Sequence, residues 1–218
     1  MPRTADHQAR RRQIVDGVRR VAVTDGLSRV TMAGAAREAG VSVGLVQHYY
    51  SSKEDLLVDT VRSVHEDIEQ RVDAAVARAE RRFARIEQMM AAGLQQLFPL
   101  DDRRREETRL RHSFAGLALE NERLHEHQRR FDESLAARAA QAVRNGLLCG
   151  EVLPGTDPDQ EGYAVISLAD GLAARLLMHA GRRQRAWARA AVTARMAAVF
   201  PGPCARESKV RDADADAV

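Results

Sequence analysis

Two helix signals lie only a few residues apart near the N-terminus, and they constrain the fold of this chain more than any other feature. Thr31 is a good N-cap residue, and the helix that it predicts ends at Gly40, which tolerates the positive φ of a turn. Ser42 then caps a second short helix that we expect to end near Tyr49. The pattern is that of a helix-turn-helix, with its turn at Ala39-Gly40-Val41. An ordinary αα-hairpin in a helical bundle would have the same pattern.

The charge distribution favours DNA over the plain hairpin. Residues 1–53 hold nine basic and four acidic side chains, a net charge of +5, whereas the whole chain has a net charge of only +3. A basic module on a slightly acidic body indicates an anionic partner for that module alone. The alternative is a solvated arginine face on the first helix. Arg supplies 32 of the 34 basic residues, an excess that is typical of a GC-rich genome.

The rest of the chain is predicted to be helical as well. Alanine, the best helix former, accounts for 37 of the 218 residues, and aromatic residues for only 4%. Apolar residues recur every three or four positions. We therefore expect an all-α fold of about nine helices, over residues 8–24, 31–39, 42–49, 52–79, 82–98, 101–120, 123–148, 157–180 and 183–200. The expected domains are a DNA-binding domain at 1–53, a helical body at 54–200 and a disordered tail at 201–218.

Several classes of protein are excluded by what the sequence lacks. No apolar run reaches the roughly 18 residues of a membrane span, and the N-terminus has no signal-peptide core, so we expect a cytoplasmic protein without a membrane partner. Cys149 and Cys204 form no metal-binding motif, and no disulfide, metal or other cofactor is expected. The sequence has no nucleophile elbow, phosphate loop or His-Glu-x-x-His motif, so we do not expect an enzyme.

The N-terminal motif resembles the TetR family of bacterial transcriptional regulators. The resemblance covers about residues 10–60 and is carried by residues 31–57, Thr-Met-Ala-Gly-Ala-Ala-Arg-Glu-Ala-Gly-Val-Ser-Val-Gly-Leu-Val-Gln-His-Tyr-Tyr-Ser-Ser-Lys-Glu-Asp-Leu-Leu. A weaker similarity of the C-terminal body points to the BetI-like branch, through residues 107–126, 146–150, 157–158 and 169–172. Gly34, Val43 and Gln47 depart from the usual pattern, which affects the operator that is read rather than DNA binding itself.

The resemblance implies a recognition helix that lies in the major groove of double-stranded DNA. Ser42 and Gln47 are expected to bond base edges, Val43 and Leu45 to touch thymine methyls, and Gly44 to allow close approach. Phosphate contacts are expected from Thr31, His48, Tyr49 and Lys53, and contacts to flanking phosphates or the minor groove from Arg10, Arg11 and Arg12. Three alternatives stay open: Ser42 is only a cap, His48 packs against the next helix, or the three arginines are solvated. Tyr50 is expected in the core.

For the body, the resemblance implies a pocket for a small-molecule effector of unknown identity. The candidate lining residues are Met89, Met90, Phe114, Leu117, Asn121 and Phe131, each of which is also compatible with an ordinary core position. His112, His125 and His127 suggest a metal site, but His125 and His127 point to different sides of a helix. Small residues along the last two helices, about 158–200, are expected to form a homodimer, which would read a palindromic operator.

Two functions therefore compete. The first is a repressor that an effector releases from its operator, acting at the bacterial nucleoid. The second is a DNA-binding regulator that has no effector or is controlled by another protein. The low aromatic content offers little for a cage around a cation such as choline, so no effector is assigned.

Overall fold

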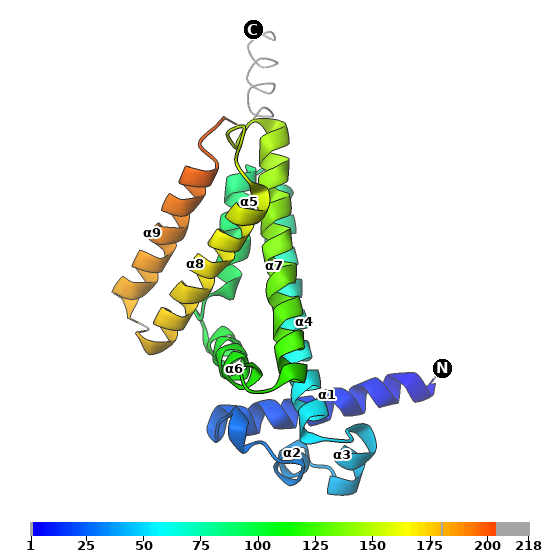
Figure 1. Cartoon of the computed structure of the whole chain (residues 1–218). Helices are drawn as coiled ribbons and strands as arrows, with labels where there is room; N and C mark the ends of the chain where they lie inside the picture. Colours follow the sequence, from blue (N-terminus) through cyan, green and yellow to red (C-terminus); the bar gives the residue numbers. More distant parts are fainter. Residues whose placement is uncertain (1, 180, 204–218) are drawn as a thin grey trace. The chain divides into compact units, whose positions relative to one another are not determined.

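The computed structural model describes residues 2–179 and 181–203, and this part of the chain is all-α, as predicted (Figure 1). It forms nine α-helices and two 3-10 helices and contains no strand. The α-helices are α1 (Pro2–Thr24), α2 (Met32–Ala39), α3 (Val43–Tyr49), α4 (Lys53–Glu80), α5 (Ile86–Leu94), α6 (Asp102–Ala118), α7 (Glu122–Cys149), α8 (Pro158–Met178) and α9 (Arg182–Val199). The 3-10 helices are η1 (Leu27–Arg29) and η2 (Gln95–Leu97).

Packing divides the described chain into two compact units. The N-terminal unit contains the residues up to Asp67 together with Arg105–Phe131, and the C-terminal unit contains Ile68–Arg104 and the described residues from Asp132 onward. The predicted domain boundary at 53/54 follows the first residue of α4, Lys53. Of the predicted tail at 201–218, residues 204–218 lie outside the part of the chain that the structure describes.

The N-terminal unit is built on a close crossing of α1 and α2. Gly17 of α1 is buried, and a Cβ added there would lie 2.8 Å from both the Ala35 carbonyl oxygen and the Ala39 nitrogen. The small residues of α2 therefore face a glycine on α1. From the sequence, the small side chains of Ala35, Ala36 and Ala39 are expected to allow a close crossing of α2 with α3. In the structure, Ala35 and Ala39 lie against Gly17 of α1, so the close crossing that needs small residues is the one between α1 and α2.

The helix-turn-helix has the local geometry that its residues predict. The Thr31 hydroxyl accepts a hydrogen bond from the Gly34 nitrogen at 3.0 Å, and the Ser42 hydroxyl accepts one from the Leu45 nitrogen at 3.1 Å. Between the caps, Gly40 adopts the left-handed conformation with φ 65°. Two satisfied N-caps and one glycine turn thus fix how α3 leaves α2.

The C-terminal unit repeats the glycine crossing between α7 and α8. A Cβ on the buried Gly162 would lie 2.7 Å from the Ala136 carbonyl oxygen and from the Ala140 nitrogen. The Asp157 carboxylate caps α8 by accepting hydrogen bonds from the nitrogens of Asp159 and Gln160. Figure 1 shows α8 and α9 side by side.

The segment 82–98 is not the single helix that its apolar spacing predicts. Phe83 has a positive φ of 56° and is 92% exposed, although its spacing predicts a core position. α5 begins only at Ile86, where the Glu151 carboxylate accepts hydrogen bonds from the Ile86 and Glu87 nitrogens at 3.3 and 3.4 Å. A residue 65 positions away thus stabilises the start of α5. The local spacing of apolar residues cannot predict such a contact.

Two smaller expectations also change at helix starts. α1 begins at Pro2, several residues before the expected start at position 8. At the start of α4, the Ser52 hydroxyl accepts a hydrogen bond from the Asp55 nitrogen at 3.1 Å, which is one half of the capping box that the residues Ser52-Lys53-Glu54-Asp55 suggest. The Asp55 carboxylate, however, accepts from the hydroxyl of Ser51 and from Arg123 of α7. These bonds lower the pKa of Asp55 to about 2.

Candidate functional site

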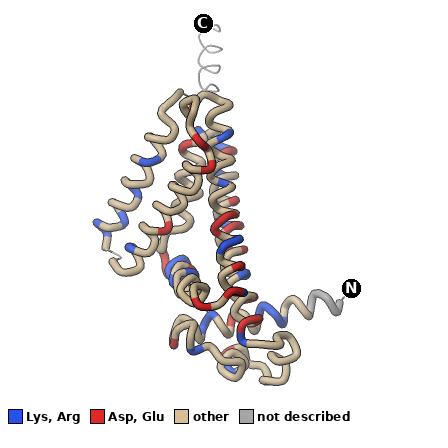
Figure 2. Tube along the Cα trace, viewed as in Figure 1, with Lys and Arg blue, Asp and Glu red and all other residues tan. Residues whose placement is uncertain are grey.

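The outward face of α3 carries most of the residues predicted to read bases. Val43 is 39% exposed, Gly44, Gln47 and the cap Ser42 are exposed, and Leu45 is half-buried. Val46 is fully buried and anchors the opposite face of the helix. A Cβ on Gly44 would meet nothing within 4 Å, so the backbone there faces open space. The helix has no Lys, Arg, Asp or Glu, as Figure 2 shows.

The residues predicted to hold phosphates surround the ends of α2 and α3. His48 is exposed and its ring lies edge-on to that of Tyr49, with the centroids 5.5 Å apart. This exposure favours the phosphate interpretation of His48 over packing against the next helix. Thr31 is exposed, and a hydroxyl that accepts a capping bond keeps its proton to donate. Lys53 donates to the Ser28 carbonyl at 2.8 Å, which fixes the ammonium beside η1.

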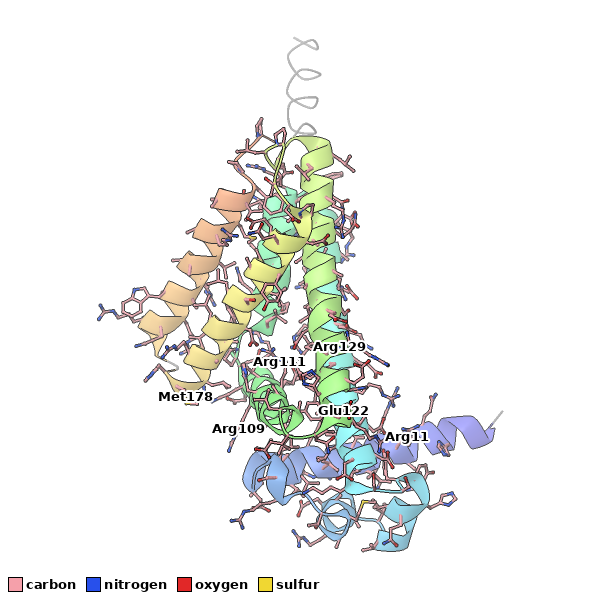
Figure 3. The ribbon with its side chains drawn as sticks, in the orientation of Figure 1. Arg11, Arg109, Arg111, Glu122, Arg129 and Met178 are labelled. Atoms are coloured by element: carbon pink, nitrogen blue, oxygen red, sulfur yellow. The ribbon has the colours of Figure 1, made fainter. Side chains whose placement is uncertain are left out.

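The three arginines of α1 differ in their surroundings. Arg12 is exposed, and Arg10 is exposed and donates to Gln13 at 2.9 Å. Arg11 points toward α4, where its guanidinium lies 3.0 Å from the buried Asp59 carboxylate (Figure 3). The Tyr50 hydroxyl donates to the same carboxylate at 2.5 Å.

Arg11, Tyr50 and Asp59 therefore form one network between α1, the end of α3 and α4. Burial, together with the bond to Asp59, raises the pKa of Tyr50. Tyr50 is 3% exposed, as expected for a core residue. The network holds α3 against the long helix that follows it, so Arg11 has a structural contact that the sequence did not reveal.

A cavity of about 290 Å³ lies within the C-terminal unit. It is bounded by α4, α5, α7 and α8, and its wall is mainly aliphatic. Of the six residues predicted to line a ligand pocket, Met89 and Met90 line this cavity.

The other four predicted lining residues belong to the N-terminal unit and do not line this cavity. Phe114 is fully buried, and Leu117 is half-buried. The Asn121 side chain caps α7 by accepting from the Leu124 nitrogen at 3.2 Å. Phe131 stacks on His65 with the ring centroids 3.6 Å apart and the planes 8° from parallel. These positions fit the alternative interpretation, ordinary core and cap.

Sequence reasoning missed several buried ionisable side chains, of which His65 and Glu151 are two. His65 of α4 is 5% exposed, and burial, with the nearby charge of Arg111, lowers its pKa to about 3. Glu151 in the loop before α8 is completely buried, with Arg85 at 3.6 Å besides the nitrogens of α5. His65 lies four positions after Val61 and three before Ile68, so helical spacing puts it on the buried face of α4, whereas Glu151 lies in a loop for which spacing predicts nothing.

No metal site forms among the histidines that suggested one. Within residues 2–179 and 181–203, no three His, Cys, Asp or Glu side chains gather closely enough to hold a metal ion. His127 lies 6.5 Å from His65 between ring centroids, and His125 is exposed. Cys149 carries a thiol rather than a disulfide, and Cys204 lies outside the described residues. None of the helices in this part of the chain is long and apolar enough to cross a membrane.

Comparison with known proteins agrees with this geometry. Residues 86–201 match the C-terminal family of BetI-type transcriptional repressors, and residues 14–60 match the N-terminal family of tetR bacterial regulatory proteins. The chain belongs to the TetR family. The family and the names of the relatives indicate a helix-turn-helix transcriptional regulator rather than an enzyme, as predicted.

The relatives cover this chain to different extents. The regulator BetI of Agrobacterium fabrum is 42% identical over 79 residues, which are 36% of this chain and 38% of the relative. The chain thus spans about two fifths of the length of that curated relative. Among solved structures, a regulator from Rhodococcus sp. Rha1 has a TM-score of 0.76 at 19% identity, covering 88% of this chain and 96% of that one. A choline complex of a regulator from Saccharomonospora viridis has a TM-score of 0.70 at 20% identity, covering 84% and 92%.

Proposed function

We propose that this TetR-family regulator binds a palindromic operator as a homodimer and represses transcription until a small molecule releases it. The observation that carries the proposal is the uncharged outward face of α3, with Gln47 and Gly44 exposed and Val46 buried beneath them. A neutral helix reads bases through amide and methyl contacts, Gln47 most naturally to adenine. Phosphates are then held from the flanks, by Tyr49, His48, Thr31 and Lys53. Such a regulator would act in the cytoplasm, at the nucleoid.

Dimerisation through α8 and α9 is supported by apolar side chains exposed on both helices. Tyr163 is 71% exposed, Trp187 is 56% exposed, and Met178 projects at the end of α8 (Figure 3). Exposed apolar groups on neighbouring helices mark an interaction surface. A two-fold dimer presents two copies of α3 to half-sites one helical turn apart, about 34 Å. Sedimentation equilibrium should show a dimer, and Trp187→Glu should shift it to monomer.

The cavity in the C-terminal unit supports release by an effector rather than the alternative of a regulator without one. A ligand that binds one conformation of the dimer better than another shifts the population toward it. In the proposed mechanism, the favoured conformation spaces the two α3 helices too widely or too closely for the half-sites. The choline held by the Saccharomonospora viridis regulator makes a small cation one effector to test.

The experiment begins by mapping the genomic DNA that the protein binds, which supplies the operator. Operator affinity is then measured by fluorescence anisotropy over a range of salt concentrations. Lys53→Ala should weaken binding and lower the slope of log K against log salt by about 1 for each phosphate that the lysine neutralises. Gln47→Ala should cost about 1–3 kcal/mol at sites with the matching base pair.

Gln70→Ala is the matched control for Gln47→Ala, because Gln70 is an exposed helical glutamine in the C-terminal unit. Its operator affinity should equal that of the unmodified protein. Unchanged affinity in both Lys53→Ala and Gln47→Ala would rule out α3 as the reading helix.

A further inference from the structure

The wall of the cavity in the C-terminal unit is apolar along α5 and mixed, with both apolar and polar residues, along α4 and α7. α5 and the turn after it contribute only uncharged, non-aromatic residues to its wall: Ile86, Met89, Met90, Gly93, Leu94 and Leu97. The charged and amide groups come from α4 and α7 and are Asp73, Glu80, Arg138 and Asn145. A bound molecule therefore meets an aliphatic surface along α5 and polar groups only on the opposite side.

The polar groups form an exposed rim rather than a buried binding site. Asp73 and Arg138 form an ion pair with each other, with 62% and 38% of their side chains exposed. Glu80 and Asn145 are exposed, and the Asn145 side chain accepts a hydrogen bond from Gln141 at 3.0 Å. Because these groups remain in contact with water, the interior offers no buried partner for a charged ligand.

The lining also lacks what a quaternary ammonium needs. Such cations are recognised by the faces of aromatic rings, and none of the residues that line the cavity is aromatic. Aliphatic walls with two adjacent methionines adapt instead to flexible apolar molecules. The volume of about 290 Å³ is roughly twice that of an engineered cavity of about 150 Å³ that binds benzene.

We propose that the cavity binds an uncharged amphiphile, a medium-length aliphatic chain along α5 with a hydroxyl head that donates to the carboxylates of the rim. The regulatory meaning of this site rests on the proposed function, whereas the ligand class rests on the lining alone. Such a site would differ in ligand class from that of the Saccharomonospora viridis regulator, whose structure holds choline.

The test measures thermal unfolding of the full chain with 1-decanol or with choline chloride. Decanol should raise Tm by several degrees at concentrations well above its Kd, because it binds only the folded state. Choline at the same or a higher concentration should leave Tm unchanged. A choline shift without a decanol shift would overturn the inference.

The site is located by a filling variant and its control on the same helix. Ala142 lines the cavity, so Ala142→Trp should abolish the decanol shift. Ala137 is exposed and outside the lining, so Ala137→Trp should keep it. If Ala142→Trp loses its cooperative transition, Ile166→Phe fills the cavity from α8. A decanol shift that persists in a folded filling variant would overturn the assignment.

Operator binding of the unmodified protein, measured without additive on the same preparation, keeps the two proposals apart. A decanol shift together with absent operator binding supports the ligand class and overturns the proposed function. Intact operator binding together with no decanol shift overturns the ligand class alone.

Discussion

Two helix crossings, one in each unit, use the same device: a buried glycine set against two alanines four residues apart. In the N-terminal unit, Gly17 of α1 lies against Ala35 and Ala39 of α2. In the C-terminal unit, Gly162 of α8 lies against Ala136 and Ala140 of α7. In both, a Cβ in place of the glycine hydrogen would lie less than 3 Å from backbone atoms of the facing helix. Backbone contact across a crossing leaves no side chain that can move aside.

The two crossings differ in what they position and in how freely they can adjust. α2 has 8 residues and is followed by the turn to α3, so its position sets the recognition helix. α7 has 28 residues, and Ala136 and Ala140 lie in its middle, so a shift at the crossing would have to bend or move a long helix. Adding a Cβ at Gly162 in the C-terminal unit should therefore lower mainly the stability of the protein. Adding one at Gly17 in the N-terminal unit should lower both stability and DNA binding.

The largest effect is expected for Gly162→Ala. All three nearest neighbours of the added Cβ are backbone atoms of α7, at 2.7 to 3.0 Å, so overpacking should lower the free energy of unfolding by about 3 kcal/mol. Urea denaturation measures the loss. Gly171→Ala on the same helix is the control, because a Cβ there meets nothing within 4 Å, and it should not destabilise the protein. Equal stability of the two variants would contradict the close backbone contact between α7 and α8 at Gly162.

Gly17→Ala should lower the free energy of unfolding somewhat less, by about 2 kcal/mol, because the short helix α2 can shift. That shift should displace α3 and weaken operator binding well beyond what Gly162→Ala does at a temperature where both are folded. Urea denaturation and fluorescence anisotropy measure the two effects. If Gly17→Ala loses stability but binds the operator normally, α2 does not set the position of α3 and the contrast between the crossings fails.

Each unit also contains a buried ionisable side chain, and the two differ in their surroundings. For His65, these surroundings make the free energy of unfolding depend on pH. Glu151 in the C-terminal unit is surrounded by Arg85 and the start of α5, whereas His65 in the N-terminal unit has a buried Nε2 without a hydrogen-bond partner in the described structure. The charged and titratable groups that face His65 are Arg111 and His127, and both oppose its protonation. The unfolded chain, with a histidine pKa near 6.5, therefore takes up this proton first as the pH falls.

The free energy of unfolding should consequently decrease by about 1–2 kcal/mol between pH 6.5 and 4.5, and continue to decrease toward the folded pKa of about 3. His127 adds to the same trend, since burial also lowers its pKa. His65→Phe, which can keep the stack on Phe131, should flatten the dependence, whereas the exposed His125→Phe should not. Urea denaturation at the two pH values measures this, and an unchanged slope in His65→Phe would exclude His65 as its source.

How much of the fold the sequence reveals depends on how far apart in the chain the interacting residues lie. The caps Thr31 and Ser42 and the turn at Gly40 act within a few residues, so the helix-turn-helix and its outward face were predictable. Gly17, Arg11 and Glu151 act through partners 18 to 65 positions away, and a single sequence does not show such pairs. The ligand candidates divided in the same way: Met89 and Met90 were found by their helical spacing, but apolar spacing cannot tell a cavity wall from a filled core, where Phe114 lies.

The smallest effect on stability is expected for Gly44→Ala. Gly17 allows close contact between two helices of the protein, and this variant tests whether Gly44 allows close contact between α3 and DNA. A Cβ at Gly44 meets nothing within 4 Å, so alanine should raise the free energy of unfolding by up to about 1 kcal/mol through its helix propensity. If the backbone of α3 approaches DNA closely, the same methyl group should weaken operator binding. Gly116→Ala, in an equally open position on α6, should give the stability gain without the loss of affinity. Equal operator affinity of the two variants would mean that Gly44 is not a site of close approach, and the reading face of α3 would then rest on Ser42, Val43 and Gln47.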